Sequence, residues 1–105
     1  MTKELENRVT GFLGLCMRAG QVQSGQEACV ELIRAGSAKL ALLDESASPN
    51  TLKRVRDACA AHQVPLYELS AGALGACIGK RERMVLALGA GGMTDKLLQM
   101  LKQQD

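Results

Sequence analysis

Aromatic side chains are almost absent from this chain, which has no tryptophan, one phenylalanine (Phe12) and one tyrosine (Tyr67). A hydrophobic core must therefore be built from leucine, valine, isoleucine, alanine and methionine. Hydrophobic residues make up 47% of the chain and charged residues 23%, which is ordinary for a folded soluble protein. A length of 105 residues suits one core, and no linker interrupts the chain, so we expect a single domain over residues 1–105.

Metal-binding residues are scarce as well. The four cysteines lie far apart with no Cys-x-x-Cys pair, and His62 is the only imidazole. The spacing typical of zinc sites is therefore missing. Each cysteine has apolar neighbours, which favours a small buried side chain in a reducing compartment. These cysteines are Cys16, Cys29, Cys59 and Cys77.

Nucleophilic catalysis has little support in the sequence. No cysteine or serine has a histidine close by, and His62 is expected near the C-terminal end of a helix, where its charge complements the helix dipole. Asp44 and Glu45 follow an expected strand, a position where α/β folds often carry functional groups, but turn formation or capping explains them as well. We expect a protein that is not an enzyme and has no cofactor or small-molecule substrate.

Long apolar segments are also missing. The longest nearly apolar run, residues 84–93, is broken by glycines and is too short to span a bilayer. The first six residues lack the apolar stretch of a signal peptide. We therefore expect a cytoplasmic protein without membrane contact. The net charge of +2 says little about partners, but basic residues cluster at 53–56 and 80–83. The first cluster lies mid-helix beside Asp57, which favours a solvated face.

Hydrophobic periodicity predicts alternating helices and strands, which is typical of an α/β fold with helices on both faces of a small sheet. We expect Ser24 to cap the second helix and Ser70 to cap the fourth. Proline in an early position supports the third helix, and Pro65 favours a strand start or an edge strand. The expected helices cover residues 3–18, 24–36, 48–62, 70–79 and 94–103, and the expected strands cover 21–23, 39–43, 64–67 and 84–88.

The glycine-rich segment 89–92 has the outline of a phosphate-binding loop between a strand and a helix. It lacks the Lys-Ser/Thr pair of a P-loop and the G-x-G-x-x-G pattern, and Asp95 would repel an anion. A flexible turn is therefore favoured. Binding of a small nucleotide here remains an alternative, which would be detected as thermal stabilisation by nucleotides.

Two other segments carry the functional argument. Residues 24–28 open a helix, and a helix start with glycine lets a phosphate approach unpaired backbone N–H groups. Gln26 and Glu27 can hydrogen-bond base edges there. Residues 74–83 end a helix with Gly79 and then present three basic side chains, which can bind RNA phosphates. From the residues alone, an equally good interpretation is that Ser24 only caps and the basic loop only faces solvent.

The order of these motifs resembles the kink-turn-binding ribosomal-protein family of archaeal ribosomal protein L-seven-Ae, especially its bacterial YlxQ-like branch. The similarity covers residues 5–100. It implies a three-layer α/β/α sandwich around a four-stranded mixed sheet and an RNA-binding function without catalysis. The residues that carry it are Arg18-Ala19-Gly20, Ser24-Gly25, Glu27-Ala28, Gly36, Ala38-Lys39-Leu40, Asp44, Ser46-Ala47, Asn50-Thr51, Val64-Pro65, Leu74-Gly75 and Ile78-Gly79-Lys80.

In that family, the start of the second helix docks into the major groove at tandem G·A pairs, and the loop after Leu-Gly-x-x-x-Gly contacts the extruded nucleotide. The resemblance therefore implies binding to structured RNA, with ribosomal RNA or another ribonucleoprotein as the expected partner. The implied RNA-binding residues are Ser24, Gly25, Gln26, Glu27, Lys39, Lys80, Arg81 and Arg83.

Three positions depart from the family pattern. Glu27 stands where the well-studied members have asparagine, Ala28 where they have glutamate, and Glu31 where they have lysine. An anion in place of a cation near phosphates weakens binding. The basic loop at 80–83 can offset this loss. The alternative function is a protein-interaction module of the same fold that has lost kink-turn binding.

Overall fold

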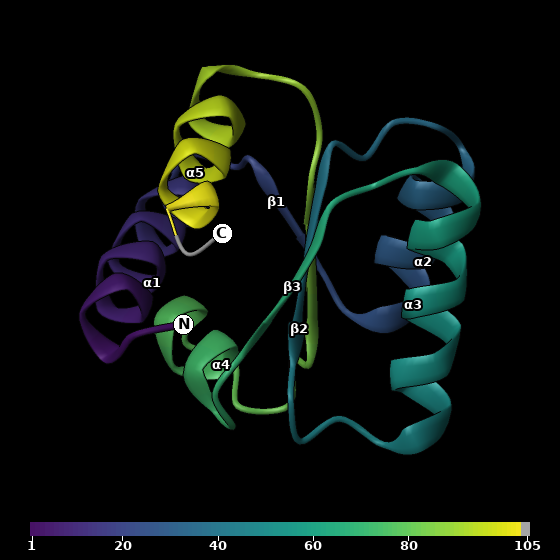
Figure 1. The fold of residues 1–105 in the computed structure, drawn as a ribbon, viewed down its shortest axis with the longest axis horizontal. Helices are drawn as coiled ribbons and strands as arrows, with labels where there is room; N and C mark the ends of the chain where they lie inside the picture. Colours follow the sequence, from purple (N-terminus) through teal and green to yellow (C-terminus); the bar gives the residue numbers. More distant parts are fainter. Residues whose placement is uncertain (104–105) are drawn as a thin grey trace.

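The computed structural model describes residues 1–103, which form five helices and four strands in alternation (Figure 1). The first helix matches the predicted bounds, and the third begins at Pro49, an early proline as predicted, with Ser48 as its cap. The elements are α1 (Lys3–Arg18), β1 (Val22–Ser24), α2 (Gln26–Arg34), β2 (Leu40–Asp44), α3 (Pro49–His62), β3 (Leu66–Leu69), α4 (Ala73–Ile78), β4 (Val85–Leu88) and α5 (Gly92–Lys102).

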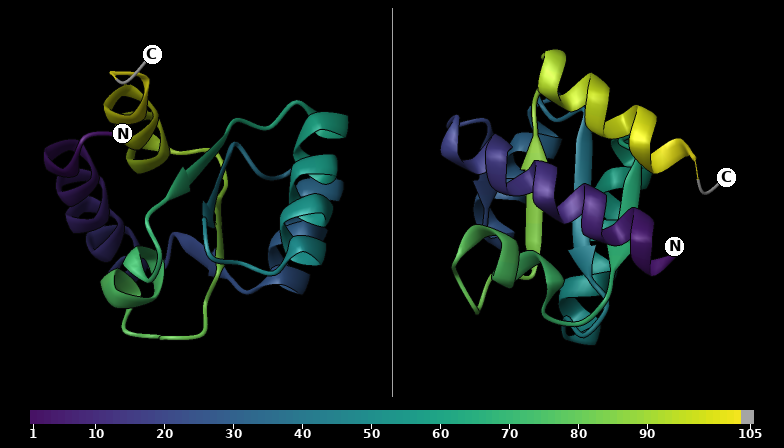
Figure 2. Two further views of the ribbon diagram at one scale, coloured as in Figure 1. Left: turned by 60° about the horizontal axis from the view of Figure 1, so that its bottom comes forward. Right: turned by 90° about the vertical axis from the view of Figure 1, so that its left-hand side faces the viewer.

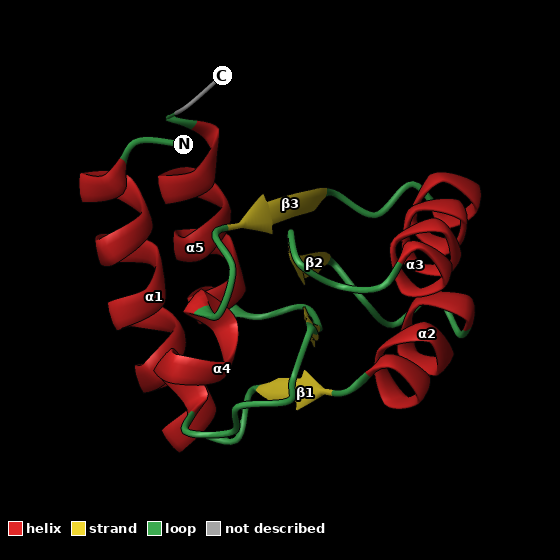
Figure 3. Ribbon diagram, turned by 90° about the horizontal axis from the view of Figure 1, so that it is seen from below, coloured by secondary structure: helices red, strands yellow, loops and turns green. Residues whose placement is uncertain are grey.

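The four strands form one mixed sheet in the order β1-β4-β2-β3. β2 pairs with β3 in parallel and with β4 in antiparallel orientation, and β1 pairs antiparallel with β4. Helices α2 and α3 cover one face, and α1, α4 and α5 cover the other (Figure 3). α1 and α5 lie side by side across their face (Figure 2). This arrangement confirms the predicted three-layer sandwich, and β3, which follows Pro65, lies at an edge as predicted.

The central strands divide the core into two halves. Alternate side chains of a strand point to opposite faces, so Leu40 and Leu42 of β2 pack under α1, α4 and α5. Ala41 and Leu43 pack under α2 and α3. Because both faces of β2 are covered, the whole strand is buried, and residues 40–43 form one apolar run. Aliphatic side chains fill nearly all of both halves, as the shortage of aromatic residues requires.

Two predicted helix caps are wrong. Ser24 is the last residue of β1, and the cap of α2 is Gly25, which makes no side-chain hydrogen bond. Gly25 donates its N–H to the Val85 oxygen at 3.0 Å and then turns the chain with a φ of 96°. Likewise, α4 is capped by Gly72 with a φ of 82°, while Ser70 hydrogen-bonds Glu6. In both cases a glycine with positive φ begins the helix instead of the serine upstream.

The direction of the strands determines which loops meet. β1, β2 and β3 all run toward the same end of the sheet, which we call the carboxyl end, and the antiparallel strand β4 begins there. The start of α2, the start of α3 and the loop of residues 79–84 therefore share this end (Figure 1). The glycine segment 89–92 follows β4 and lies at the opposite end.

Candidate nucleic-acid interface

The carboxyl end of the sheet brings together seven of the eight residues that the sequence predicts to bind RNA. Residues 24–27 lie at the β1–α2 junction, and the loop of residues 80–83 leads into β4 beside it. Lys39 lies elsewhere, because it precedes β2 and donates its N–H to the Leu88 oxygen at 2.8 Å. Along the sheet, Lys39 lies four residues, or about 13 Å, before Leu43, which pairs with Val85 at the carboxyl end. A role for Lys39 in RNA binding stays a prediction, but it lies outside this group.

Arg83 and Gly25 join the two segments directly. A Cβ atom on Gly25 would lie 2.8 Å from Nη1 of Arg83, so the guanidinium group occupies the space that a side chain would fill. Arg83 is half-buried and forms no side-chain hydrogen bond or ion pair with any residue in the described range 1–103. A half-buried cation thus lies against the uncapped, electropositive start of α2. This combination favours an anion.

The basic loop is held in place by a close contact with α4. Lys80 donates its N–H to the Gly75 oxygen at 2.9 Å. A Cβ on Gly75 would lie 2.8 Å from the Lys80 oxygen and 3.0 Å from the Arg81 oxygen, so only glycine allows the loop to approach. The side chains of Lys80 and Arg81 remain exposed, and the four loop residues 80–83 line an open pocket of about 500 Å³.

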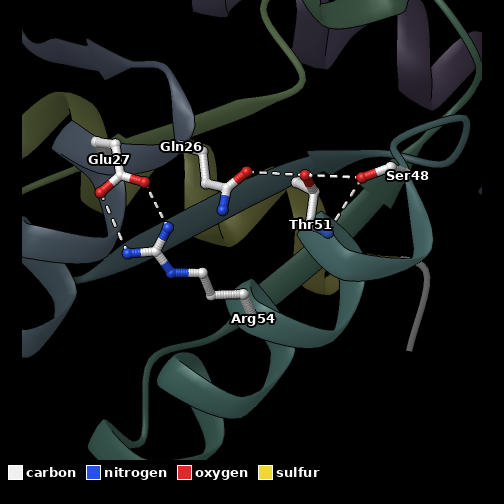
Figure 4. A network of polar contacts seen from close by, with 5 residues as sticks. All are labelled: Gln26, Glu27, Ser48, Thr51 and Arg54. Carbon is white, nitrogen blue, oxygen red and sulfur yellow. Dashed lines mark hydrogen bonds and ion pairs between the residues drawn. The ribbon is translucent and has the colours of Figure 1, made fainter.

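Gln26 is oriented by a hydrogen-bond chain from the start of α3 (Figure 4). The Thr51 hydroxyl donates to Gln26 Oε1 at 2.8 Å, and the Ser48 hydroxyl donates to Thr51 Oγ1 at 3.0 Å. Thr51 also donates its N–H to Ser48 Oγ at 3.2 Å. The oxygen of Gln26 therefore accepts from Thr51, which orients the amide, and its amide nitrogen, which points away from Thr51, has no acceptor within residues 1–103. The side chain offers donors to an RNA base.

Glu27 is not a free acceptor, because both of its carboxylate oxygens accept hydrogen bonds from Arg54 of α3 (Figure 4). The bond from Nη2 to Oε2 measures 3.1 Å. The hydrogen bonds from Arg54, together with its charge, lower the pKa of the Glu27 carboxyl. Sequence reasoning missed Arg54 by placing residues 53–56 on a solvated face. That interpretation fits Lys53, which pairs with Asp57 on its own helix at 2.7 Å. No local signal distinguishes Arg54, because its partner lies on another helix.

The remaining candidate groups have structural surroundings. Asp44 is buried and accepts bonds from the Ser46 N–H at 2.8 Å, the Ser46 hydroxyl at 2.6 Å and the Gly72 N–H at 2.8 Å, in agreement with turn formation. All four cysteines are free thiols, and burial raises the pKa of Cys29 to about 12 and that of Cys59 to about 11. Within residues 1–103, no cluster of His, Cys, Asp and Glu side chains could hold a metal ion. No helix in this range has the length and apolarity to cross a membrane.

Comparison with known proteins places the chain in a family. The model of the ribosomal protein L7Ae/L30e/S12e/Gadd45 family matches residues 7–96. The chain is 43% identical over 91 residues to the RNA-binding protein YlxQ of Bacillus subtilis (strain 168), covering 86% of this chain and 91% of that protein.

Solved structures of other proteins share the fold, and two of them illustrate the match. A protein with unknown function from Bacillus halodurans C is 32% identical with a TM-score of 0.81, covering 90% of this chain and 96% of that one. The Giardia lamblia 15.5kD RNA binding protein is 16% identical with a TM-score of 0.84, covering 98% of this chain and 89% of that one. From the family match and the 43% identity, we conclude that this chain belongs to the ribosomal protein L7Ae/L30e/S12e/Gadd45 family.

Proposed function

We propose that this protein binds structured RNA through the carboxyl end of its sheet. The observation that carries the proposal is the contact between Arg83 and Gly25, which combines an unpaired guanidinium with the free N–H groups at the start of α2. A phosphate group satisfies both with its oxygen atoms. The relative from Bacillus subtilis, which bears the name RNA-binding protein, supports this function.

The interface divides into positioning and reading residues. Lys80, Arg81 and Arg83 bind backbone phosphates, which supplies affinity without sequence preference. Gln26 donates its amide hydrogens to acceptors on base edges, since the hydrogen bond from Thr51 to its oxygen orients the amide nitrogen toward the ligand. Proteins read RNA by sequence mainly where the helix is irregular and base edges are accessible. We therefore propose a kink-turn in cytoplasmic ribosomal RNA, or in another structured RNA, as the target.

The test measures binding to two hairpins across a range of salt concentrations. One hairpin carries a kink-turn with tandem G·A pairs, and the other has Watson–Crick pairs in their place. We expect tighter binding to the first and affinity for both that falls with salt. Lys80→Ala combined with Arg81→Ala should weaken binding to both hairpins. It should also lower the salt slope, which is the change in the logarithm of the dissociation constant per tenfold change in salt concentration, by roughly 1.5. Each phosphate contact contributes about 0.7 to 0.9 to this slope.

Two results would contradict the proposal. Equal binding to both hairpins removes the kink-turn as the target. Absence of salt-dependent binding removes RNA as the ligand. In the second case, recovery of a specific protein partner from RNase-treated lysate would support the alternative of a protein-interaction module.

A further inference from the structure

The Glu27–Arg54 pair lies where the proposed interface needs cations, although it presents none to solvent in the free protein. Arg54 is one turn beyond Thr51 on α3 and reaches the first turn of α2. Arg83 contacts the same helix start at Gly25. Two guanidinium groups therefore flank the start of α2, one unpaired and one paired with Glu27.

The paired group has the geometry of a phosphate site. Each nitrogen of the Arg54 fork donates to one oxygen of the Glu27 carboxylate. A guanidinium fork binds a phosphate with the same two parallel hydrogen bonds. The carboxylate thus stands in the place that two phosphate oxygens would take.

Exposure shows which partner can move. The side chain of Glu27 is 77% exposed, whereas that of Arg54 is 34% exposed and reaches across from α3 to α2. Water screens an ion pair this close to solvent, so the pair contributes little to stability. The carboxylate can therefore leave at little cost, while the guanidinium stays in position.

The rest of this helix face offers no replacement cation in its first two turns. Glu31 follows Glu27 by one turn and is exposed, and the basic residue of α2 nearest to them, Arg34, lies in its last turn. A phosphate that approaches the start of α2 therefore meets two carboxylates. The cation that can attract it on this side is Arg54, supplied by the neighbouring helix.

We propose that Arg54 is a further RNA-backbone contact that Glu27 masks in the free protein, so that a phosphate group displaces the Glu27 carboxylate when RNA binds. This inference rests on the RNA-binding function proposed above. Masking penalises any RNA that does not also engage residues 80–83 and Gln26, because a phosphate alone must compete with Glu27. The pair therefore favours selective over general RNA binding.

The test uses the same two hairpins and the charge-removing variant Glu27→Gln. We expect Glu27→Gln to bind both hairpins more tightly, by up to about fivefold, because the carboxylate no longer competes with the phosphate for Arg54. The gain should be larger on the control hairpin, so the preference for the kink-turn falls. Asp57→Asn is the matched control, since it makes the same charge change on α3 by releasing Lys53. It should alter both dissociation constants less than twofold.

A charge-neutral double variant separates masking from simple repulsion. Glu27→Gln with Arg54→Gln keeps the net charge of the wild type, and Asp57→Asn with Lys53→Gln does the same at the control pair. Masking predicts that the first double variant has a salt slope lower than wild type by about 0.7 to 0.9, because one phosphate contact is gone. The control double variant keeps the wild-type slope. Thermal unfolding of each variant verifies that it is folded.

The possible outcomes distinguish the two proposals. If wild type binds but Glu27→Gln binds no better than Asp57→Asn, or binds more weakly, the masking proposal is overturned and the RNA-binding function stands. If the double variant Glu27→Gln with Arg54→Gln keeps the wild-type salt slope, the masking proposal is also overturned, and the RNA-binding function stands. If neither wild type nor Glu27→Gln binds either hairpin, both proposals fail.

Discussion

Residue 25 has three roles in the structure, and the last two require glycine. Its N–H extends the β1–β4 pairing by bonding to Val85, its φ of 96° with a ψ of 147° turns the chain into α2, and its missing Cβ leaves room for Arg83. That backbone region is nearly exclusive to glycine. The fold and the proposed phosphate contact therefore depend on the same residue, because the turn that starts α2 also admits the cation.

We predict that Gly25→Ala lowers the free energy of unfolding by about 1 to 3 kcal/mol, because alanine is strained in this conformation. The added Cβ also displaces the end of the Arg83 side chain, so RNA binding should weaken beyond what the stability loss explains. Gly36→Ala is the control, because its φ of 75° imposes strain with no atom within 4 Å of the new Cβ. Urea unfolding and hairpin titration measure the two effects. Equal RNA affinity of the two variants would contradict the role of Arg83.

At the scale of elements, the position of α4 decides where the basic loop lies. The β3–α4 connection, residues 70–72, donates backbone N–H groups to three carboxylates from other parts of the chain: Glu6, Glu45 and Asp44. Burial of Asp44 alone would raise its pKa, but the hydrogen bonds from Ser46 and Gly72 outweigh burial and lower the pKa of this carboxyl. The ionised side chain of Asp44 thus links the end of β2 to the start of α4.

We predict that Asp44→Asn destabilises the protein by about 1 to 3 kcal/mol at pH 7, because a buried charged acceptor is lost. Since the pKa is lowered in the folded state, the carboxylate stabilises the fold above its unfolded pKa and ceases to do so as pH falls through the folded value. The difference between wild type and variant should therefore shrink below about pH 4. Urea unfolding at pH 7 and pH 3 measures it, with Glu45→Gln as the exposed control. A difference that is independent of pH would contradict this assignment.

The elements also show what sequence patterns can and cannot predict. Helix α1 follows from the spacing of Leu5, Val9 and Leu13, and α3 follows from Ser48 and Pro49, because these signals act within one element. The cap at Ser24 was wrong because strand pairing extends past this serine to Gly25. The cap at Ser70 was wrong because its N–H and hydroxyl bond to Glu6, and the helix begins only after Gly72. The partner of Glu27 could not be predicted, because the contact with Arg54 depends on how α2 packs against α3.

For the whole molecule, the distribution of charge matters more than its sum. A net charge of +2 gives no strong attraction to RNA, yet Arg54, Lys80, Arg81 and Arg83 lie at the carboxyl end of the sheet. A local concentration of cations attracts phosphates even on a nearly neutral protein. The candidate interface follows from topology, because two segments about fifty residues apart meet only when β1 and β4 pair.

The topology leads to a prediction about the two ends of the sheet. Lys39→Ala and Lys80→Ala remove the same charge from exposed side chains at opposite ends. Screening at ordinary salt acts over about 10 Å, so a distant lysine contributes little to a bound phosphate. We expect Lys80→Ala to lower the salt slope by about 0.7 to 0.9 and to weaken hairpin binding, while Lys39→Ala changes the dissociation constant less than twofold. If both variants lose affinity equally, the RNA extends along the sheet to the end that holds Lys39 and the glycine segment 89–92.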